Sequence, residues 1–142
     1  MQKLNIALVG LGFGGSFLPI YLDHPQVASV GIFDTDETIM KQAKETWPEV
    51  RLYNSFDEIL ADQTLDAVHL VTPIPAHADQ TVAVLESGKH CACTVPMATS
   101  LEDIERIFAA IRKSGKKYMM METTLYTYQF FYVKQMIHEG KL

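Results

Sequence analysis

The stretch IALVGLGFGGSFLPIYL, Ile6 to Leu22, decides how this chain begins to fold. It is almost wholly apolar and approaches the length of a membrane-spanning helix. It also contains four glycines within six positions: Gly10, Gly12, Gly14 and Gly15. Each glycine would cost a helix up to about 1 kcal/mol, and Asp23 to Gln26 offer no small-residue cleavage site for a secretory signal. The stretch therefore predicts a buried strand, a glycine turn and a helix.

The glycines fit the spacing G-x-G-x-x-G at Gly10, Gly12 and Gly15, with Phe13 and Gly14 inside the loop. A strand is predicted before them over Leu4–Val9 and a helix after them over Ser16–Asp23. In a dinucleotide-binding turn the first glycine makes the turn, the second admits a pyrophosphate, and the third lets the helix pack closely. The helix N-terminus then attracts the phosphates. A glycine-rich turn without a ligand is the alternative.

An acidic residue at the end of the next predicted strand supports the dinucleotide interpretation. Val27–Phe33 reads as that strand, and Asp34 follows twenty-four residues after Gly10. Such a carboxylate holds ribose hydroxyls in dinucleotide-binding units. Asp34 could instead, or also, cap the helix predicted over Thr35–Thr46. No Arg or Lys occurs between Asp34 and Lys41 to accept a 2′-phosphate, which favours NAD over NADP as the cofactor.

The rest of the chain alternates between strand and helix patterns. Further strands are predicted over Arg51–Tyr53, Leu65–Thr72, His90–Thr94 and Lys117–Met121, and further helices from Phe56 to Ala61 and over Pro75–Ser87, Leu101–Ser114 and Tyr126–Glu139. Ser55 and Ser100 have carboxylates three positions on, which is typical of helix starts. This alternation predicts a Rossmann-type, doubly wound parallel sheet of about six strands with helices on both faces.

Ligands bind at the carboxyl ends of the strands in such sheets. Two further stretches should therefore reach the same crevice, Thr72–His77 and Thr94–Met97. His69 lies within a predicted strand and is interpreted as a core residue. His77 lies in the first turn of a helix at the crevice, and is the better functional candidate.

Composition limits the other possible functions. The hydrophobic share of 48% and charged share of 20% are ordinary for a globular domain. The formal net charge is −5, and the sequence does not predict a basic face suited to nucleic acid. Cys91 and Cys93 lie on one face of a strand, where we interpret them as small apolar core residues. Even with the neighbouring His90 they do not complete a zinc site, so we expect no metal. Free thiols suit a reducing compartment, and the expected location is the cytoplasm.

Longer motifs resemble the glucose-fructose oxidoreductase / inositol dehydrogenase / rhizopine catabolism protein family of NAD(P)-dependent oxidoreductases. They are VGLGFGG, VTPIPAHADQTVAVLESGKH, CTVPMATS and VKQMIHEGKL, which together span the chain. The resemblance implies that Thr72, Pro73, Ile74 and His77 contact the nicotinamide half of the cofactor. Thr94 and Pro96 are expected to lie beside it.

The chain also departs from the family pattern. The family usually has Glu-Lys-Pro where this sequence has Thr94-Val95-Pro96, and Val95 cannot replace a lysine that polarises the substrate. An Asn-Arg-Arg-like stretch is likewise replaced by Thr123 to Leu125. Family members continue into a second, substrate-binding α/β domain, so we expect a truncated chain, with residues 1–121 as the cofactor domain and 122–142 as a connecting helix.

The expected function is hydride transfer between a nicotinamide cofactor and a sugar, polyol or related hydroxyl substrate. The alternatives are an NAD-dependent glycosidase of the same family and a non-catalytic NAD-binding regulatory module, which Val95 supports. The catalytic residues are unknown, with His77 and Tyr126 as candidates. The aromatic last helix suggests a surface that another copy covers, hence a homo-oligomer without nucleic-acid or membrane partners.

Overall fold

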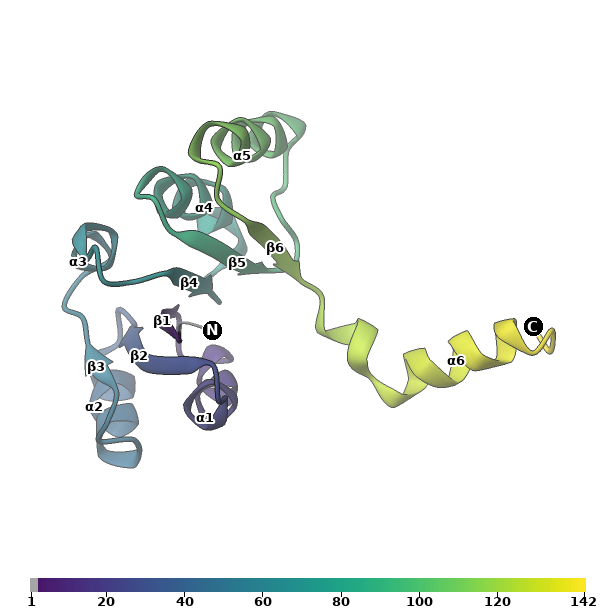
Figure 1. Cartoon of the computed structure of the whole chain (residues 1–142), viewed down its shortest axis with the longest axis horizontal. Helices are drawn as coiled ribbons and strands as arrows, with labels where there is room; N and C mark the ends of the chain where they lie inside the picture. The colour runs from purple at the N-terminus through teal and green to yellow at the C-terminus, as the bar shows by residue number, and fades with distance from the viewer. Residues whose placement is uncertain (1–2) are drawn as a thin grey trace.

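The computed structural model describes residues 3–142 and contains one six-stranded sheet, in the order β3-β2-β1-β4-β5-β6. All neighbouring strands are parallel (Figure 1). The strands are β1 (Leu4–Val9), β2 (Val27–Phe33), β3 (Arg51–Leu52), β4 (Ala67–Leu70), β5 (His90–Thr94) and β6 (Tyr118–Met121). The strand order reverses between β1 and β4, which confirms the doubly wound Rossmann-type sheet.

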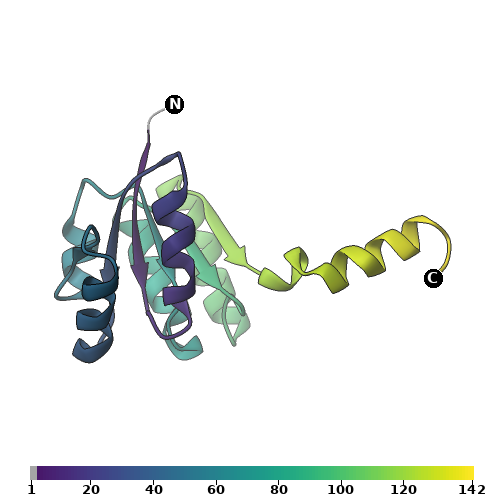
Figure 2. The ribbon, with the colours of Figure 1, turned by 90° about the horizontal axis from the view of Figure 1, so that it is seen from below.

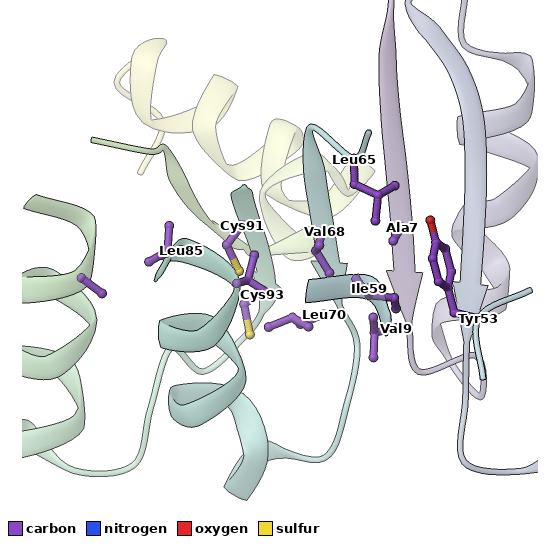
Figure 3. Packing of buried hydrophobic residues seen from close by; sticks show 12 residues of the cluster. Ala7, Val9, Tyr53, Ile59, Leu65, Val68, Leu70, Leu85, Cys91 and Cys93 are labelled. Carbon is purple, nitrogen blue, oxygen red and sulfur yellow. The ribbon is translucent and has the colours of Figure 1, made fainter. Parts of the chain in front are cut away.

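The helices cover both faces of this sheet. They are α1 (Leu18–Asp23), α2 (Glu37–Thr46), α3 (Phe56–Ala61), α4 (His77–Glu86) and α5 (Leu101–Ser114), and a last helix, α6 (Tyr128–His138), follows β6. One buried cluster joins α1 and α2 to β1 and β2, through residues such as Leu18, Ala43 and Leu8. The other joins α3, α4 and α5 to the opposite face of β1, β4 and β5 (Figure 3).

Both predicted serine caps are present. Ser55 accepts a hydrogen bond from the Glu58 N–H, and Ser100 accepts one from the Asp103 N–H, each at 3.1 Å. These bonds satisfy N–H groups that have no partner inside the helix. Gly115 ends α5 with φ of 64°, a left-handed conformation that glycine adopts without strain.

The first helix differs from its predicted bounds. Residues Gly14–Phe17 form a 3₁₀ turn, and the α-helix begins only at Leu18. This late start puts Pro19 in the first turn, where its missing N–H removes no intrahelical bond. The helix after β4 is divided in a similar way, because a 3₁₀ turn at Ile74–Ala76 precedes α4.

The last helix, α6, projects away from the body of the molecule (Figures 1 and 2). None of its residues is buried, and Tyr128, Phe131 and Tyr132 are each more than half exposed. Within residues 3–142 no helix has the length and apolar character needed to cross a membrane.

Candidate functional site

A cavity of about 500 Å³ opens at the carboxyl ends of β1, β2 and β4. Seven of the predicted cofactor residues line it: Gly10, Gly12, Phe13, Asp34, Thr35, Thr72 and Pro73. They come from three separate stretches, as the sheet topology predicted. The volume is within the usual range for small-molecule sites.

Gly10 and Gly12 contribute to this cavity in different ways. Gly10 has φ of 87°, and a Cβ atom on it would lie 2.4 Å from the Val71 carbonyl oxygen. A side chain is therefore excluded by both backbone conformation and space. A Cβ on Gly12 would meet nothing within 4 Å, so this glycine borders open space in the cavity.

The close-packing role predicted for Gly15 belongs to Gly14. A Cβ on Gly14 would lie 3.1 Å from the Val71 Cβ, and Gly14 is buried. A Cβ on Gly15 would meet nothing within 4 Å, and Gly15 lines a separate hollow between α1 and α2. The 3₁₀ turn accounts for the difference, because it begins at Gly14 and turns that residue toward the end of β4.

The Asp34 carboxylate is held by the glycine turn. Its Oδ2 accepts a 2.6 Å hydrogen bond from the Leu11 N–H, and its Oδ1 accepts one of 3.0 Å from the Asp36 N–H. The alternative that Asp34 caps the next helix is wrong. Asp36 is that cap, since its side chain accepts from the N–H groups of Thr38 and Ile39.

Gln80, which the sequence did not predict as a site residue, supports the cavity wall just after β4. The Thr72 hydroxyl donates to Gln80 Oε1 at 2.5 Å, and Gln80 also lines the cavity. Its position one turn after His77 in α4 was the available signal. The other missed lining residues are apolar: Val9, Phe33, Ile39 and Val71.

His77 lies behind the cavity wall and does not line it. Its side chain is only 1% exposed, its Nε2 lies 2.8 Å from the Thr72 carbonyl oxygen, and its Nδ1 lies 2.8 Å from the Pro96 carbonyl oxygen. Thr94 is also turned toward backbone, because its hydroxyl donates to the Leu70 carbonyl oxygen at 3.4 Å. Ile74, Thr94 and Pro96 do not line the cavity.

His69 is buried, as predicted for a core residue. Its Nδ1 lies 2.9 Å from the Tyr21 hydroxyl, and the Phe17 ring packs edge-on against it. Its Nε2 has no hydrogen-bond partner among the residues that the structure describes. Burial lowers the pKa of His69 to about 4. A neutral ring buried in this way is suited to packing rather than to proton transfer near neutral pH.

Cys91 and Cys93 are free and buried on the face of β5 that α4 covers. Burial raises the pKa of the Cys91 thiol to about 12 and that of Cys93 to about 11. They are therefore the small apolar core residues that the sequence predicted. Among residues 3–142, no three His, Cys, Asp or Glu side chains are grouped in a way that could hold a metal ion.

The second catalytic candidate, Tyr126, lies outside the cavity. Its side chain is 69% exposed and lines an apolar groove with Phe17 and Ile20 of the first helical segment and Met119 and Met121 of β6. The structure does not bring Tyr126 together with the glycine turn and Asp34.

The residues around the cavity fit a dinucleotide. Open space at Gly12 allows a phosphate to approach the backbone, and Asp34 presents a carboxylate already oriented by two N–H groups. Glycine turns without side chains let a pyrophosphate approach the backbone, and carboxylates accept hydrogen bonds from ribose hydroxyls.

Curated relatives match most of this chain. A 1-carboxy-3-chloro-3,4-dihydroxycyclo hexa-1,5-diene dehydrogenase of Comamonas testosteroni is 27% identical over 139 residues, which cover 97% of this chain and 35% of the relative. A glycosyl hydrolase family 109 protein of Shewanella putrefaciens is 27% identical, over 99% of this chain and 33% of the relative. A scyllo-inositol 2-dehydrogenase (NADP(+)) of Bacillus subtilis is 25% identical, over 100% of this chain and 39% of the relative. The chain thus spans little more than a third of the length of these relatives.

Solved structures share the fold closely. An NAD-binding protein from Listeria innocua superposes with a TM-score of 0.90 and 25% identity, over 99% of this chain and 40% of that protein. The sequence model of the oxidoreductase family with an NAD-binding Rossmann fold, GFO_IDH_MocA, matches residues 4–122. With its parallel sheet, glycine turn and cavity, this chain belongs to that oxidoreductase family.

Proposed function

We propose that this chain is the cofactor-binding part of a dehydrogenase that acts on a hydroxyl-bearing carbon of a sugar, polyol or related compound. The single observation that carries the proposal is the arrangement of Gly12 and Asp34 on one cavity, with open space at the glycine and an oriented carboxylate. The dehydrogenases among the relatives support the reaction class.

The chain's own residues bind and orient the cofactor. The backbone around Gly12 would receive the pyrophosphate, and Asp34 would accept hydrogen bonds from the adenosine ribose. Thr72 and Pro73 would form the wall along which the second half of the dinucleotide lies. When bound, the nicotinamide supplies the hydride chemistry, and the protein supplies position and shelter from water.

The proton that accompanies hydride transfer needs a donor or acceptor outside this arrangement. Both ring nitrogens of His77 lie against backbone carbonyls, and Tyr126 lies outside the cavity. Val95 carries no ionisable group where the family pattern has lysine. We therefore propose that the acid–base group lies outside the 142 residues.

We also propose that NAD is bound in preference to NADP. A 2′-phosphate would meet the Asp34 carboxylate, and two further acidic residues follow, Asp36 and Glu37. Lys41 is the first cation after Asp34, and it lines an adjoining hollow of about 470 Å³ together with Lys44, Asp34, Glu37 and Glu45. The Lys44 ammonium donates to the carbonyl oxygens of Pro48 and Val50, and the carboxylates outnumber the lysines. The local charge thus opposes an additional phosphate.

Titration of the chain with NADH and NADPH tests both proposals, with Asp34→Asn as the variant. We expect wild type to bind NADH more tightly, and Asp34→Asn to lose about 10-fold in NADH affinity and most of its discrimination against NADPH. Asp36→Asn is the matched control. It removes the same charge two residues away and keeps the helix cap, because asparagine caps as well as aspartate does.

Equal losses in both variants would mean that only the general charge matters, and the specific role of Asp34 would then be wrong. Absence of NADH and NADPH binding to wild type would contradict the proposed function itself.

A glycosidase that oxidises its sugar transiently is the second candidate, and the family 109 relative supports it. The two candidates differ in their products: a dehydrogenase releases an oxidised substrate and NADH, whereas the glycosidase releases a free sugar and leaves NAD unchanged. A third candidate, a non-catalytic module, is supported by Val95. NADH production in a substrate screen would eliminate it.

Residues 1–121 would form the cofactor domain, and 122–142 would lead into a substrate-binding domain. We propose that the exposed aromatic residues of α6 are covered by another copy in a homo-oligomer. The two free thiols support a cytoplasmic location.

A further inference from the structure

His77 connects two loops through Thr72 and Pro96, which are twenty-four positions apart in sequence. The residue begins α4, between the loop that follows β4 and the loop that follows β5. Its Nε2 contacts the carbonyl oxygen of Thr72 in the first loop, and its Nδ1 contacts that of Pro96 in the second, each at 2.8 Å.

Both ring nitrogens of His77 thus face carbonyl oxygens. Carbonyl oxygens only accept, so the doubly protonated ring donates to both of them, and either neutral tautomer donates to one. The ring is 1% exposed, and neither nitrogen is directed at the cavity. Its effect on the cavity therefore passes through Thr72.

Thr72 has a second tie to α4, through its hydroxyl and Gln80 Oε1. The cavity wall at Thr72 is thus tied to α4 twice, through the Thr72 hydroxyl to Gln80 and through the Thr72 carbonyl oxygen to His77. The same ring contacts the Pro96 carbonyl oxygen and so ties the β5 loop to α4.

The sheet order determines which part of a dinucleotide this wall would meet. Asp34 follows β2, the glycine turn follows β1, and the loops joined by His77 follow β4 and β5. A dinucleotide with its adenosine at Asp34 and its pyrophosphate at Gly12 would direct its nicotinamide half toward β4 and β5.

We propose that His77 is a positioning residue. Its ring bridges the β4 and β5 loops, and this bridge, which we call the strap, holds the two loops where the nicotinamide half binds. The inference rests on the proposed function and goes beyond it. His77 acts through the two carbonyl groups and exchanges no proton with a substrate.

The binding test compares NADH with ADP-ribose, which lacks the nicotinamide. In His77→Ala we expect the Kd for NADH to rise about 10-fold, as for one or two lost hydrogen bonds, while the Kd for ADP-ribose stays within about 2-fold of wild type. His77→Gln can donate one of the two bonds and should give an intermediate value. Val84→Ala is the control, because Val84 lies in the same helix as His77, is fully buried and belongs to the hydrophobic core cluster.

Val84→Ala should lower the unfolding free energy and leave the ratio of the two Kd values unchanged. Equal weakening of NADH and ADP-ribose in His77→Ala, or no change in either, would overturn the strap. His77→Gln keeps the test decisive if His77→Ala does not fold.

Hydrogen exchange tests the strap without any ligand. In the two His77 variants, we expect exchange in residues 71–76 and 95–99 to rise relative to the glycine turn at 10–15, and Val84→Ala should leave this ratio as in wild type. An unchanged ratio in the His77 variants would refute the strap even if the cofactor binds. Absence of NADH and ADP-ribose binding to wild type, with the expected exchange pattern, would instead refute only the proposed function.

Discussion

Replacing Gly12 with alanine should separate cofactor binding from folding. A Cβ on Gly12 meets nothing within 4 Å, and its φ lies outside the left-handed region. The folded chain should therefore tolerate the methyl group, and its unfolding free energy should rise by up to about 1 kcal/mol, because alanine restricts the unfolded chain.

The same methyl group enters the cavity that Gly12 lines. It would hold a pyrophosphate away from the backbone and weaken about two charge-assisted hydrogen bonds. A combined loss of about 2–3 kcal/mol corresponds to a fall in NADH affinity of about 30- to 150-fold. Fluorescence titration with NADH and urea unfolding of the same variant measure the two effects separately.

Gly15→Ala is the matched control. A Cβ there also meets nothing within 4 Å, but Gly15 lines a different hollow. This variant should keep wild-type NADH affinity and match Gly12→Ala in stability. Wild-type affinity in Gly12→Ala, or an equal loss in Gly15→Ala, would refute the assignment of the phosphate position.

Three further predictions concern the core. Burial lowers the folded-state pKa of His69 to about 4 from 6.5, so protonation of the unfolded chain should lower the unfolding free energy by about 2 kcal/mol between pH 7 and pH 5. Urea unfolding of His69→Leu at both pH values should lack this decrease. Gly31→Ala should cost about 1–3 kcal/mol in thermal or urea unfolding, since its Cβ would lie 2.3 Å from Cε2 of the buried Tyr53 ring; wild-type stability would contradict this packing. Cys91 and Cys93 should react with a disulfide reagent at pH 8 at least about 100-fold more slowly in the native chain than in the urea-unfolded chain, and rapid native reaction would show that β5 is accessible.

The sheet could be predicted because each sequence signal for it lies within a few neighbouring residues. Apolar runs, serine caps and the glycine at the end of α5 each determine a few neighbouring residues, and their alternation implies parallel strands. The strand predicted over Leu65–Thr72 was too long for a related reason. Val71 and Thr72 continue the strand pattern in the sequence, but β4 ends at Leu70 and both residues line the cavity. Val71 keeps one bond to the sheet, from its N–H to the Val9 carbonyl oxygen.

Contacts between distant residues could not be predicted in this way. The partners of His77 are carbonyl oxygens, and every residue has one, so no side-chain pattern marks Thr72 or Pro96 as its partners. The same limit applies to Gly31. It must lack a side chain because the ring of Tyr53, twenty-two positions later, occupies that space.

The glycine turn shows why spacing alone left two interpretations open. Gly10 and Gly14 both face Val71, more than fifty residues away, because pairing of β1 with β4 brings the end of β4 against the turn. Packing therefore explains these two glycines without any ligand. It does not explain Gly12, which has open space in front of it inside a cavity that also contains Asp34. A glycine that packing does not require still costs conformational entropy on folding. Gly15 is also free of close contacts but lines a separate hollow, so Gly12 is the residue that favours a bound phosphate over a simple turn.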